Sequence, residues 1–582
     1  MRSLRKLGFA TLMMSSVSVP ALAESPVTFD RMSNPEPENW LMPHGTYNQW
    51  RHSMLTELTP ENVGGLRLAF AVPLGGPAGH FGTETVPLVD DGFMYVTNSA
   101  QQVFKYNVQS GAIAQQIWSF DPEADLDGTN FRLLVTNRGV AINGDLVIAN
   151  TPDGRVFALD KNSGETVWDR QVGIEIAENF TSQPLALRDM VLVANSRGDL
   201  GGRGWAASLD AATGDEIWRF YMVPGPGEAG HETWPADSDA WMTGGASVWT
   251  QPSYDIESNL LYYGTSNAAP AFDPAYRPGD NLYTSSTVVL DADTGQLEWY
   301  FQYVPNEGFE WDEITPNLLV DTEVNGEMRS VMAHHSTRNG YYYLLDATTG
   351  EFILAQPNSP GTNWTAGLDP KTGQPIEYDP DSDFQAYDGL NALRGGATRS
   401  GCAAASQWGG QAYNPDLNRV YSTVTDSCFT QAANAPNYDE QPYVFGLVVD
   451  GEYVGDLDYA LRGPFGFAPA PDELLRGLVG PMLTAVDVST GETVTSVRVQ
   501  AAAVASGTLG TTTGLVFTGY GNGWVRAHDA GTLATLWEVN VGTGFKAPPI
   551  TYAIDGKQYI AIAGGASGGL VNETAVLWVF TL

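Results

Sequence analysis

Four polar side chains in this sequence are of the types that combine in metal-assisted proton transfer. They are the carboxylates of Asp199 and Asp312, the amide of Asn267 and the guanidinium of Arg338. Carboxylate and amide oxygens are the ligands that a hard cation such as calcium prefers. A cation beside an aspartate and an arginine can polarise a carbonyl group while the aspartate takes a proton. Side chains this far apart in the sequence can meet only on a closed scaffold, so the elements that carry them come next.

A short repeat predicts that scaffold. In its full form an Asp is followed by Gly four residues later and by Trp after four more. The full copies span 160–168, 210–218 and 291–299, and degenerate copies start at Asn107, Asp346, Asp487 and Asp529. Each copy has the pattern of strand, tight turn and strand. Repeats of about 45–50 residues with four short strands are typical of propeller blades. Seven copies are visible, and the remaining length leaves room for an eighth.

The sequence therefore predicts an all-β, eight-bladed β-propeller. We expect each repeat tryptophan to dock between neighbouring blades, because one sheet alone cannot bury so large a ring. No helical periodicity indicates a second domain, so residues 24–582 are predicted to form a single one. Long insertions are expected near 356–400 and 429–480. Both a lid over the site and an inert surface loop remain open for them.

The first 23 residues have the pattern of a secretory signal peptide. A basic start with Arg2, Arg5 and Lys6 is followed by a short apolar run and by Ala21-Leu-Ala23. The apolar run is too short for a membrane span, and no later stretch approaches the roughly 20 apolar residues that a span needs. We expect residues 1–23 to be removed and the protein to be exported, to a bacterial periplasm.

The protein is strongly acidic. Its formal net charge is −38, and loss of the three cations in residues 1–23 takes it to −41. Such a charge argues against a nucleic-acid partner, since phosphate binding needs clustered cations. Two explanations remain open: a solvated surface that favours solubility, and steering of a basic partner such as a small electron carrier.

Cys402 and Cys428 are the only cysteines. In an oxidising compartment the pair predicts a disulfide, with two free buried thiols as the alternative. The sequence has no Cys-x-x-Cys-His motif, so this chain carries no covalently attached c-type haem.

An ordered series of motifs resembles a known family, the pyrroloquinoline quinone (PQQ)-dependent alcohol and sugar dehydrogenases. These are eight-bladed periplasmic quinoproteins, and the resemblance covers nearly all of the chain after residue 23. The motifs that carry it are Trp40-Leu41, Tyr47–Ser53, Leu58–Asn62, Gly230–Pro235, Met242–Gly245, Arg277–Tyr283, Ala547–Tyr552 and Asp555–Ala561.

The resemblance implies a set of cofactor contacts. Trp249 matches the tryptophan that stacks under the flat quinone, and Arg338 matches the cation that hydrogen-bonds its reactive oxygens. Polar contacts to the cofactor are implied for Glu84, Arg138, Thr181, Ser196 and Gln407, the last in place of the family's usual Asn. Taken singly, each of these residues could instead serve an ordinary turn, ion pair or blade core.

The resemblance also implies a metal site formed by Asp199, Asn267 and Asp312, with Asp312 as the catalytic base. The family usually has Glu at the position of Asp199, whose side chain is shorter by about 1.5 Å. Ile314 stands where lanthanide-using relatives carry an additional Asp, which favours calcium.

The function that the resemblance implies is a PQQ- and calcium-dependent dehydrogenase. It would oxidise an alcohol or a polyol- or sugar-type hydroxyl to an aldehyde or ketone, with hydride passing to PQQ and the proton to Asp312. Electrons would then leave to an external cytochrome c. Two alternatives stay open: a non-catalytic propeller that serves as a scaffold for protein docking, and an enzyme that binds the cofactor poorly because of Asp199.

Overall fold

The computed structural model describes most of the chain after residue 23. The described residues are 24–76, 82–125, 136–174, 178–196, 198, 201–270, 274–308, 311–336, 338–359, 362, 364–383, 385, 399–406, 409–431, 448–449, 452–453, 480–498, 505–565 and 574–582. At 275, 399–406, 425–431, 448–449, 452–453, 480–481 and 505 the description covers the backbone alone.

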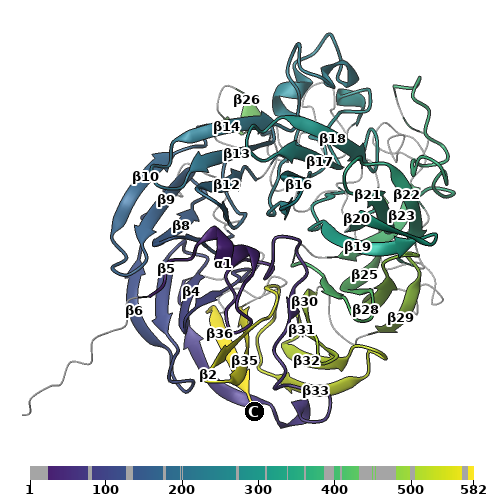
Figure 1. Ribbon diagram of the computed structural model, residues 1–582. Helices are drawn as coiled ribbons and strands as arrows, with labels where there is room; N and C mark the ends of the chain where they lie inside the picture. Colours follow the sequence, from purple (N-terminus) through teal and green to yellow (C-terminus); the bar gives the residue numbers. More distant parts are fainter. Residues whose placement is uncertain are drawn as a thin grey trace, which may run out of the picture.

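The strands form eight sheets around one axis, so the predicted eight-bladed propeller is confirmed (Figure 1). Blades 1 to 4 each contain four consecutive antiparallel strands. Blade 1 has β3 (Leu88–Asp90), β4 (Phe93–Thr97), β5 (Val103–Asn107) and β6 (Gln115–Phe120), and blade 2 has β7 (Ala141–Asn143), β8 (Leu146–Asn150), β9 (Arg155–Asp160) and β10 (Thr166–Gln171). Blade 3 has β11 (Leu185–Leu187), β12 (Met190–Ala194), β13 (Trp205–Asp210) and β14 (Glu216–Tyr221), and blade 4 has β15 (Ser253–Asp255), β16 (Leu260–Gly264), β17 (Ser286–Asp291) and β18 (Leu297–Gln302).

Blades 5 to 8 complete the ring. Blade 5 has β19 (Leu318–Val324), β20 (Glu327–His335), β21 (Tyr341–Asp346) and β22 (Phe352–Pro357), and blade 6 has β23 (Arg399–Ser406), β24 (Ala412–Asn414), β25 (Arg419–Gln431), β28 (Gly480–Asp487) and β29 (Thr493–Arg498). Blade 7 has β30 (Ala505–Thr511), β31 (Leu515–Tyr520), β32 (Trp524–Asp529) and β33 (Thr535–Asn540) with β1 (His52–Ser53). Blade 8 has β34 (Ile550–Ile554), β35 (Lys557–Gly564) and β36 (Val576–Thr581) with β2 (Arg67–Pro73).

The remaining described elements are short. A separate hairpin pairs β26 (Val448–Val449) with β27 (Glu452–Tyr453). The helical elements are α1 (Phe29–Ser33), η1 (Val63–Gly65), η3 (His231–Thr233), η4 (Ala240–Thr243) and η5 (Pro274–Tyr276). None of the helices in the described part of the chain is long and apolar enough to cross a membrane.

Blade 8 joins the two ends of the chain. Its first three strands are the C-terminal β34, β35 and β36, and its outer strand is β2 from the N-terminal region. β2 pairs antiparallel with β36, with Arg67 opposite Thr581 and Pro73 opposite Val576. This pairing closes the ring.

In blades 2 to 5 the repeat turn receives the tryptophan of the preceding blade, as predicted. In blade 3 the Asp210 carboxylate accepts hydrogen bonds from the backbone N–H groups of Ala212 and Thr213. Gly214 follows at φ +74°, and a Cβ there would lie 2.6 Å from the Trp168 ring. Glycine is therefore required both by the backbone conformation and by the close approach of the ring.

The indole N–H groups fix these contacts. Trp168 of blade 2 donates to the carbonyl of Ala211 in blade 3 at 3.0 Å. The equivalent bonds elsewhere in the ring are Trp118 to Lys161 O (3.1 Å), Trp218 to Ala292 O (3.0 Å) and Trp537 to Leu66 O (3.0 Å). Neighbouring blades are thus joined by a buried ring and a hydrogen bond at each such junction.

Replacing Trp168 by Ala is expected to lower the free energy of unfolding by about 3–5 kcal/mol, the usual cost of removing a buried aromatic side chain. The measurement is urea unfolding followed by circular dichroism. Val167→Ala is the matched control, because the Val167 side chain is 51% exposed and its loss should change stability by less than about 0.5 kcal/mol. Equal effects of the two substitutions would contradict tryptophan docking as the link between blades.

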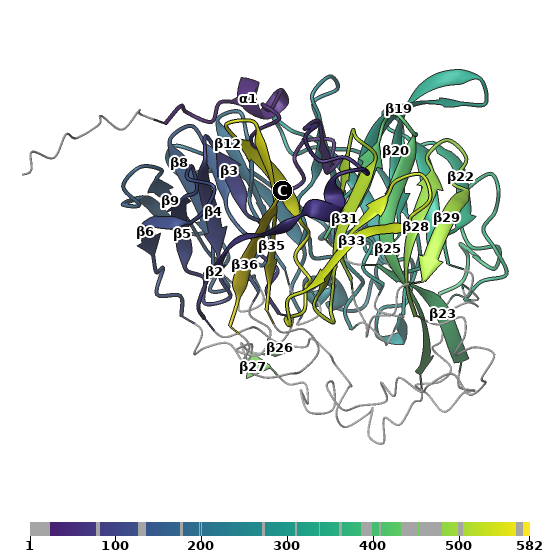
Figure 2. The same ribbon diagram turned by 90° about the horizontal axis from the view of Figure 1, so that it is seen from below.

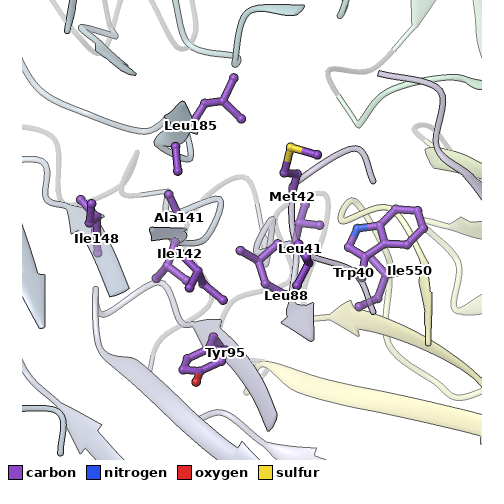
Figure 3. Packing of buried hydrophobic residues seen from close by; sticks show 14 of the residues in the cluster. Trp40, Leu41, Met42, Leu88, Tyr95, Ala141, Ile142, Ile148, Leu185 and Ile550 are labelled. Carbon is purple, nitrogen blue, oxygen red and sulfur yellow. The ribbon is translucent and has the colours of Figure 1, made fainter. Parts of the chain in front are cut away.

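The segment 40–51 fills the ring near its axis. Figure 3 shows Trp40, Leu41 and Met42 packed among residues of the first strands of four blades, namely Leu88, Ala141, Ile142, Leu185 and Ile550. Hydrogen bonds from the same segment reach blade 3, the residue before blade 4, and blades 5 and 7: Tyr47 Oη to Ala186 O (2.9 Å), Gln49 Nε2 to Pro252 O (2.7 Å), Trp50 Nε1 to Leu319 O (2.8 Å) and Arg51 Nε to Thr508 O (2.8 Å). The segment therefore braces the inner strands from within.

The two predicted insertions are described only in part. Within 356–400, residues 364–383 are described, and their contacts with the site are given below. The insertion 429–480 lies outside the described residues except at its margins and at β26 and β27. Cys402 and Cys428 are directly opposed in the register of β23 and β25. Their side chains are not described, so the disulfide stays a prediction.

Candidate active site

The described site residues lie on loops at one edge of the sheets, which Figure 2 shows side-on. In a sheet of consecutive antiparallel strands, the loop before the first strand and the loop between the second and third strands lie at the same edge. Glu84, Arg138, Thr181, Trp249 and Asp312 precede the first strands of blades 1 to 5, whereas Ser196, Asn267 and Arg338 lie between the second and third strands of blades 3 to 5. Of the predicted site residues, Asp199 and Gln407 lie outside the described part of the chain.

A buried polar cluster links blades 1, 2 and 3. The Arg138 guanidinium lies 2.8 Å from a carboxylate oxygen of Glu84. It also donates to Oγ1 of Thr181 at 2.8 Å, and Thr181 donates in turn to Oγ of Ser196 at 2.8 Å. All four side chains are buried. The structure therefore brings together four of the predicted cofactor contacts.

Trp249 lies directly beside this cluster. The guanidinium carbon of Arg138 is 4.7 Å from the centroid of the Trp249 ring, within the range of a cation–π interaction. Arg138 also donates to the Trp249 carbonyl at 3.3 Å. A cation from the loop before blade 2 thus contacts a flat ring from the loop before blade 4.

Asp312, the predicted base, lies outside the polar cluster and is surrounded by other site residues. Its carboxyl group is buried and lies 3.5 Å from the Arg338 guanidinium. Burial raises the pKa of Asp312 above its ordinary value, while Arg338, the Asn267 backbone, the Trp249 side chain and Arg138 act in the opposite direction. A carboxyl group with a raised pKa beside an arginine is suited to accept a proton.

Two of the three predicted metal ligands are close together. Asn267 is fully buried, and its backbone hydrogen-bonds the Asp312 carboxyl. Among the described residues no three His, Cys, Asp or Glu side chains form a metal-binding group. The predicted set differs from such a group, since it combines an asparagine with two aspartates, one of them undescribed. Amide and carboxylate oxygens of this kind fit a hard cation.

Lys546 is a cation that sequence reasoning missed. It precedes the first strand of blade 8, at the same edge as the other site residues, and its ammonium group lies 4.0 Å from Glu84. Burial lowers the pKa of Lys546, and Glu84 partly restores it. Two cations around one carboxylate leave the cluster with a net positive charge, which suits an anionic ligand. Its position directly before Ala547-Pro-Pro-Ile-Thr-Tyr552 was the available signal.

A buried acid beside Asp312 was also missed. Glu313 contacts His334 at 3.0 Å and accepts a hydrogen bond from Ser336 at 2.9 Å. Burial raises the pKa of Glu313 well above its usual range and lowers that of His334 to about 3. This network is built on the residue that directly follows the predicted base.

Part of the first insertion borders the site. Trp364 packs edge-on against Trp311, the neighbour of Asp312, with ring centroids 5.0 Å apart. Its indole donates to the carbonyl of Asn339, which follows Arg338, at 2.6 Å. Trp364 of this insertion therefore contacts the direct neighbours of Asp312 and Arg338, while its role as a lid or as an inert excursion stays open.

Fold and site together define a class of propeller protein with a polar site on the loops at one edge of its blades. The site combines an aromatic ring (Trp249), cations (Arg138, Lys546) and a buried amide oxygen (Asn267) with a proton acceptor (Asp312). Comparisons with known proteins agree with this class. The family model for the glucose/ethanol/alcohol dehydrogenase β-propeller domain (PQQ) matches residues 40–360 and 480–560. The chain belongs to this family, the PQQ-dependent alcohol dehydrogenases, which are oxidoreductases.

Individual relatives align over almost the whole chain. The quinohemoprotein alcohol dehydrogenase ADH-IIG of Pseudomonas putida is 31% identical over 99% of this chain and 81% of its own length. The quinoprotein alcohol dehydrogenase PedH of Pseudomonas putida is 30% identical over 100% of this chain and 98% of its own. Among solved structures, the quinohemoprotein alcohol dehydrogenase of Comamonas testosteroni has a TM-score of 0.80 at 28% identity, covering 95% of this chain and 82% of that one. A europium-containing methanol dehydrogenase has a TM-score of 0.79 at 25% identity, covering 95% and 100%.

Proposed function

We propose that this protein is a periplasmic PQQ- and calcium-dependent dehydrogenase that oxidises a hydroxyl group of an alcohol, polyol or sugar to an aldehyde or ketone. The observation that carries the proposal is the convergence on Asp312. A single buried carboxyl group with a raised pKa is contacted by Arg338, by the Asn267 backbone and by Trp249. These residues come from separate loops of blades 4 and 5 and are the ones that the resemblance to the family implies.

The aromatic and polar side chains of the candidate site suit the cofactor. The ring of Trp249 would stack on a flat quinone, while Arg138, Thr181, Ser196, Glu84, Lys546 and Gln407 would contact its carboxylates and ring atoms. Asn267 and Asp312, with Asp199, would hold calcium. When bound, PQQ with its metal supplies an electrophilic carbonyl that accepts a hydride.

The work of the protein is then to place the substrate and move one proton. Asp312 takes the proton from the substrate hydroxyl, since its raised pKa strengthens it as a base relative to an exposed aspartate. Arg338, a half-buried cation 3.5 Å from the Asp312 carboxyl group, stabilises negative charge that develops there. Trp311, next to the base in the chain, forms a buried aromatic pair with Trp364.

Calcium is favoured over a lanthanide by Ile314, which is buried and uncharged. A trivalent ion calls for more negative charge around it than Asp199, Asn267 and Asp312 supply. A europium-containing enzyme among the structural neighbours makes a lanthanide the alternative metal to test.

The N-terminal segment, the cysteine pair and the net charge support export and an external electron acceptor. The pattern of residues 1–23 supports removal of a signal peptide, and the domain would comprise residues 24–582. The opposed positions of Cys402 and Cys428 support a disulfide, because directly paired cysteines on antiparallel strands have Cα atoms about 4.5–5.5 Å apart, within disulfide range. The high negative charge suits a basic cytochrome c as the electron acceptor.

Calorimetric titration with PQQ tests the proposal. We expect calcium to tighten PQQ binding by about tenfold or more, because Asn267, Asp312 and Asp199 would hold the metal next to the bound cofactor. Lanthanum should give a smaller gain. Dye-linked activity of the loaded protein against primary, secondary and sugar alcohols then identifies the substrate class.

The scaffold alternative predicts a different result. A propeller that only docks other proteins would bind no PQQ with or without calcium, and that outcome would overturn the proposed function. Binding of PQQ without any effect of calcium or lanthanum would instead indicate that Asp199 has weakened the metal site.

A further inference from the structure

Glu313 is a fully buried acid with two firm side-chain contacts. Its Oε1 accepts a hydrogen bond from Ser336 Oγ at 2.9 Å, and its Oε2 lies 3.0 Å from His334 Nε2. Both the glutamate and the histidine have side chains with no exposed surface. Burying an acid costs free energy, so an acid kept buried directly after Asp312 indicates a specific role at this position.

The backbone of Glu313 ties it to the Asn267 loop. Its N–H donates to the carbonyl of Thr265 at 3.1 Å, two residues before Asn267. Gly264 makes this approach possible, because a Cβ there would lie 2.3 Å from the Glu313 carbonyl oxygen. The segment of Asp312 is thereby held against the end of β16.

The side chain of Glu313 ties it to the Arg338 turn. Ser336, which donates to Glu313, also accepts hydrogen bonds from the backbone N–H groups of Arg338 at 3.3 Å and Asn339 at 3.0 Å. The serine hydroxyl therefore joins the acid to the turn that presents the arginine. Through these bonds Glu313 connects the three segments that carry Asn267, Asp312 and Arg338.

His334 is a rigid support for this span. Its Nδ1 lies 2.8 Å from Asn317 Oδ1. Its ring stacks on Tyr303 with centroids 4.3 Å apart and an angle of 20° between the planes. Because the imidazole is fixed on both sides, it cannot follow Glu313 if that side chain moves.

We propose that Glu313 is a positioning residue that fixes Asp312 relative to both Arg338 and Asn267. It acts through the Ser336 hydroxyl on one side, the Thr265 carbonyl on the other, and His334 as the anchor. The inference rests on the proposed function, since it assigns the reason why the base and the arginine stay 3.5 Å apart.

The test compares variants that keep or remove the hydrogen bonds. Glu313→Gln retains an acceptor for Ser336 and offers a donor to His334 Nε2, whereas Glu313→Leu removes both contacts. Ser336→Ala removes only the link to the Arg338 turn. Ser422→Ala is the matched control, because Ser422 is a buried serine 2.6 Å from the neighbouring His335 and contacts no site residue through that bond.

Each variant is loaded with PQQ and calcium as the full chain, and kcat, KM and the calcium requirement for PQQ binding are measured. We expect Glu313→Leu to lower kcat about 100-fold with little change in KM, as for a misplaced catalytic group. The calcium concentration for half-maximal PQQ binding, followed by tryptophan fluorescence, should rise about tenfold, because Asp312 shifts away from Asn267. Ser336→Ala should lower kcat about tenfold, the effect of one lost hydrogen bond.

Glu313→Gln and Ser422→Ala should both stay close to the wild type, although the control loses a comparable buried bond. The inference is overturned if Ser336→Ala leaves kcat unchanged, or if Glu313→Gln loses as much kcat as Glu313→Leu. Should Glu313→Leu not fold, Ser336→Ala and Glu313→Gln still decide the matter. An active wild type with unaffected variants refutes only the role of Glu313, whereas a wild type that binds no PQQ refutes the proposed function itself.

Discussion

Substituting Asp312 by Asn is expected to reduce turnover by about 10³-fold, the contribution typical of a general base. Asparagine has nearly the same shape and keeps one oxygen toward Asn267, so the protein should still fold and bind PQQ. It cannot take a proton from a substrate hydroxyl. The measurement is dye-linked kcat of the PQQ-loaded variant, together with the absorption spectrum of the bound cofactor.

Asp280→Asn is the control for this substitution. Burial also raises the pKa of Asp280, which accepts a hydrogen bond from Tyr378 at 2.6 Å outside the set of site residues. Its variant should retain the activity of the wild type. Full activity in Asp312→Asn would contradict the assignment of the base, whereas loss of PQQ binding in that variant would assign Asp312 to cofactor retention.

Substituting Arg138 by Met is expected to weaken PQQ binding by about 100-fold or more and to destabilise the protein itself. The guanidinium contacts Glu84, Thr181 and Trp249, so one substitution breaks the polar cluster at its centre. Removing one partner of a buried ion pair typically costs about 3–5 kcal/mol, because the other charge is left desolvated. Fluorescence titration with PQQ and urea unfolding of the cofactor-free protein measure the two effects separately.

A double-mutant cycle shows whether the cost comes from Glu84. When Glu84→Gln is added to Arg138→Met, the double variant should be more stable than Arg138→Met alone, since no buried carboxylate then lacks the guanidinium. Arg329→Met serves as the control, because Arg329 forms its ion pairs with Asp346 and Glu351 near the surface. Its loss should change stability by less than about 1 kcal/mol. Equal costs for Arg138 and Arg329 would contradict a central role for the cluster.

The ring was predictable from the sequence because its junctions are local. An Asp that caps a turn, a Gly with positive φ and a Trp four residues later all lie within one hairpin, so their spacing is visible in the chain. Blade 8 has no such repeat, since its outer strand is β2 and no turn connects that strand to β36. The count of seven visible copies therefore has a structural cause.

The site was predictable only where a residue matched a family position. The contact between Arg138 and Trp249 joins residues 111 positions apart, which no spacing in the sequence reveals. Lys546 is a single lysine without a repeating pattern. Glu313 meets His334 and Ser336 across 21 and 23 residues, and this meeting depends on the register of β19 and β20. Such contacts are set by tertiary packing, which the linear order of residues does not encode in any simple way.

The pairing of β2 with β36 also has a consequence for how the molecule is made. Synthesis proceeds from the N-terminus, so β2 emerges long before its partner β36 (Val576–Thr581). Until then β2 is an exposed edge strand with unpaired N–H and C=O groups, a known template for aggregation. The contact between β2 and β36 is also of very high sequence separation, which slows folding. The step that seals the ring is therefore the step at which a growing chain is most vulnerable, and a chain that stops before Val576 would never complete it.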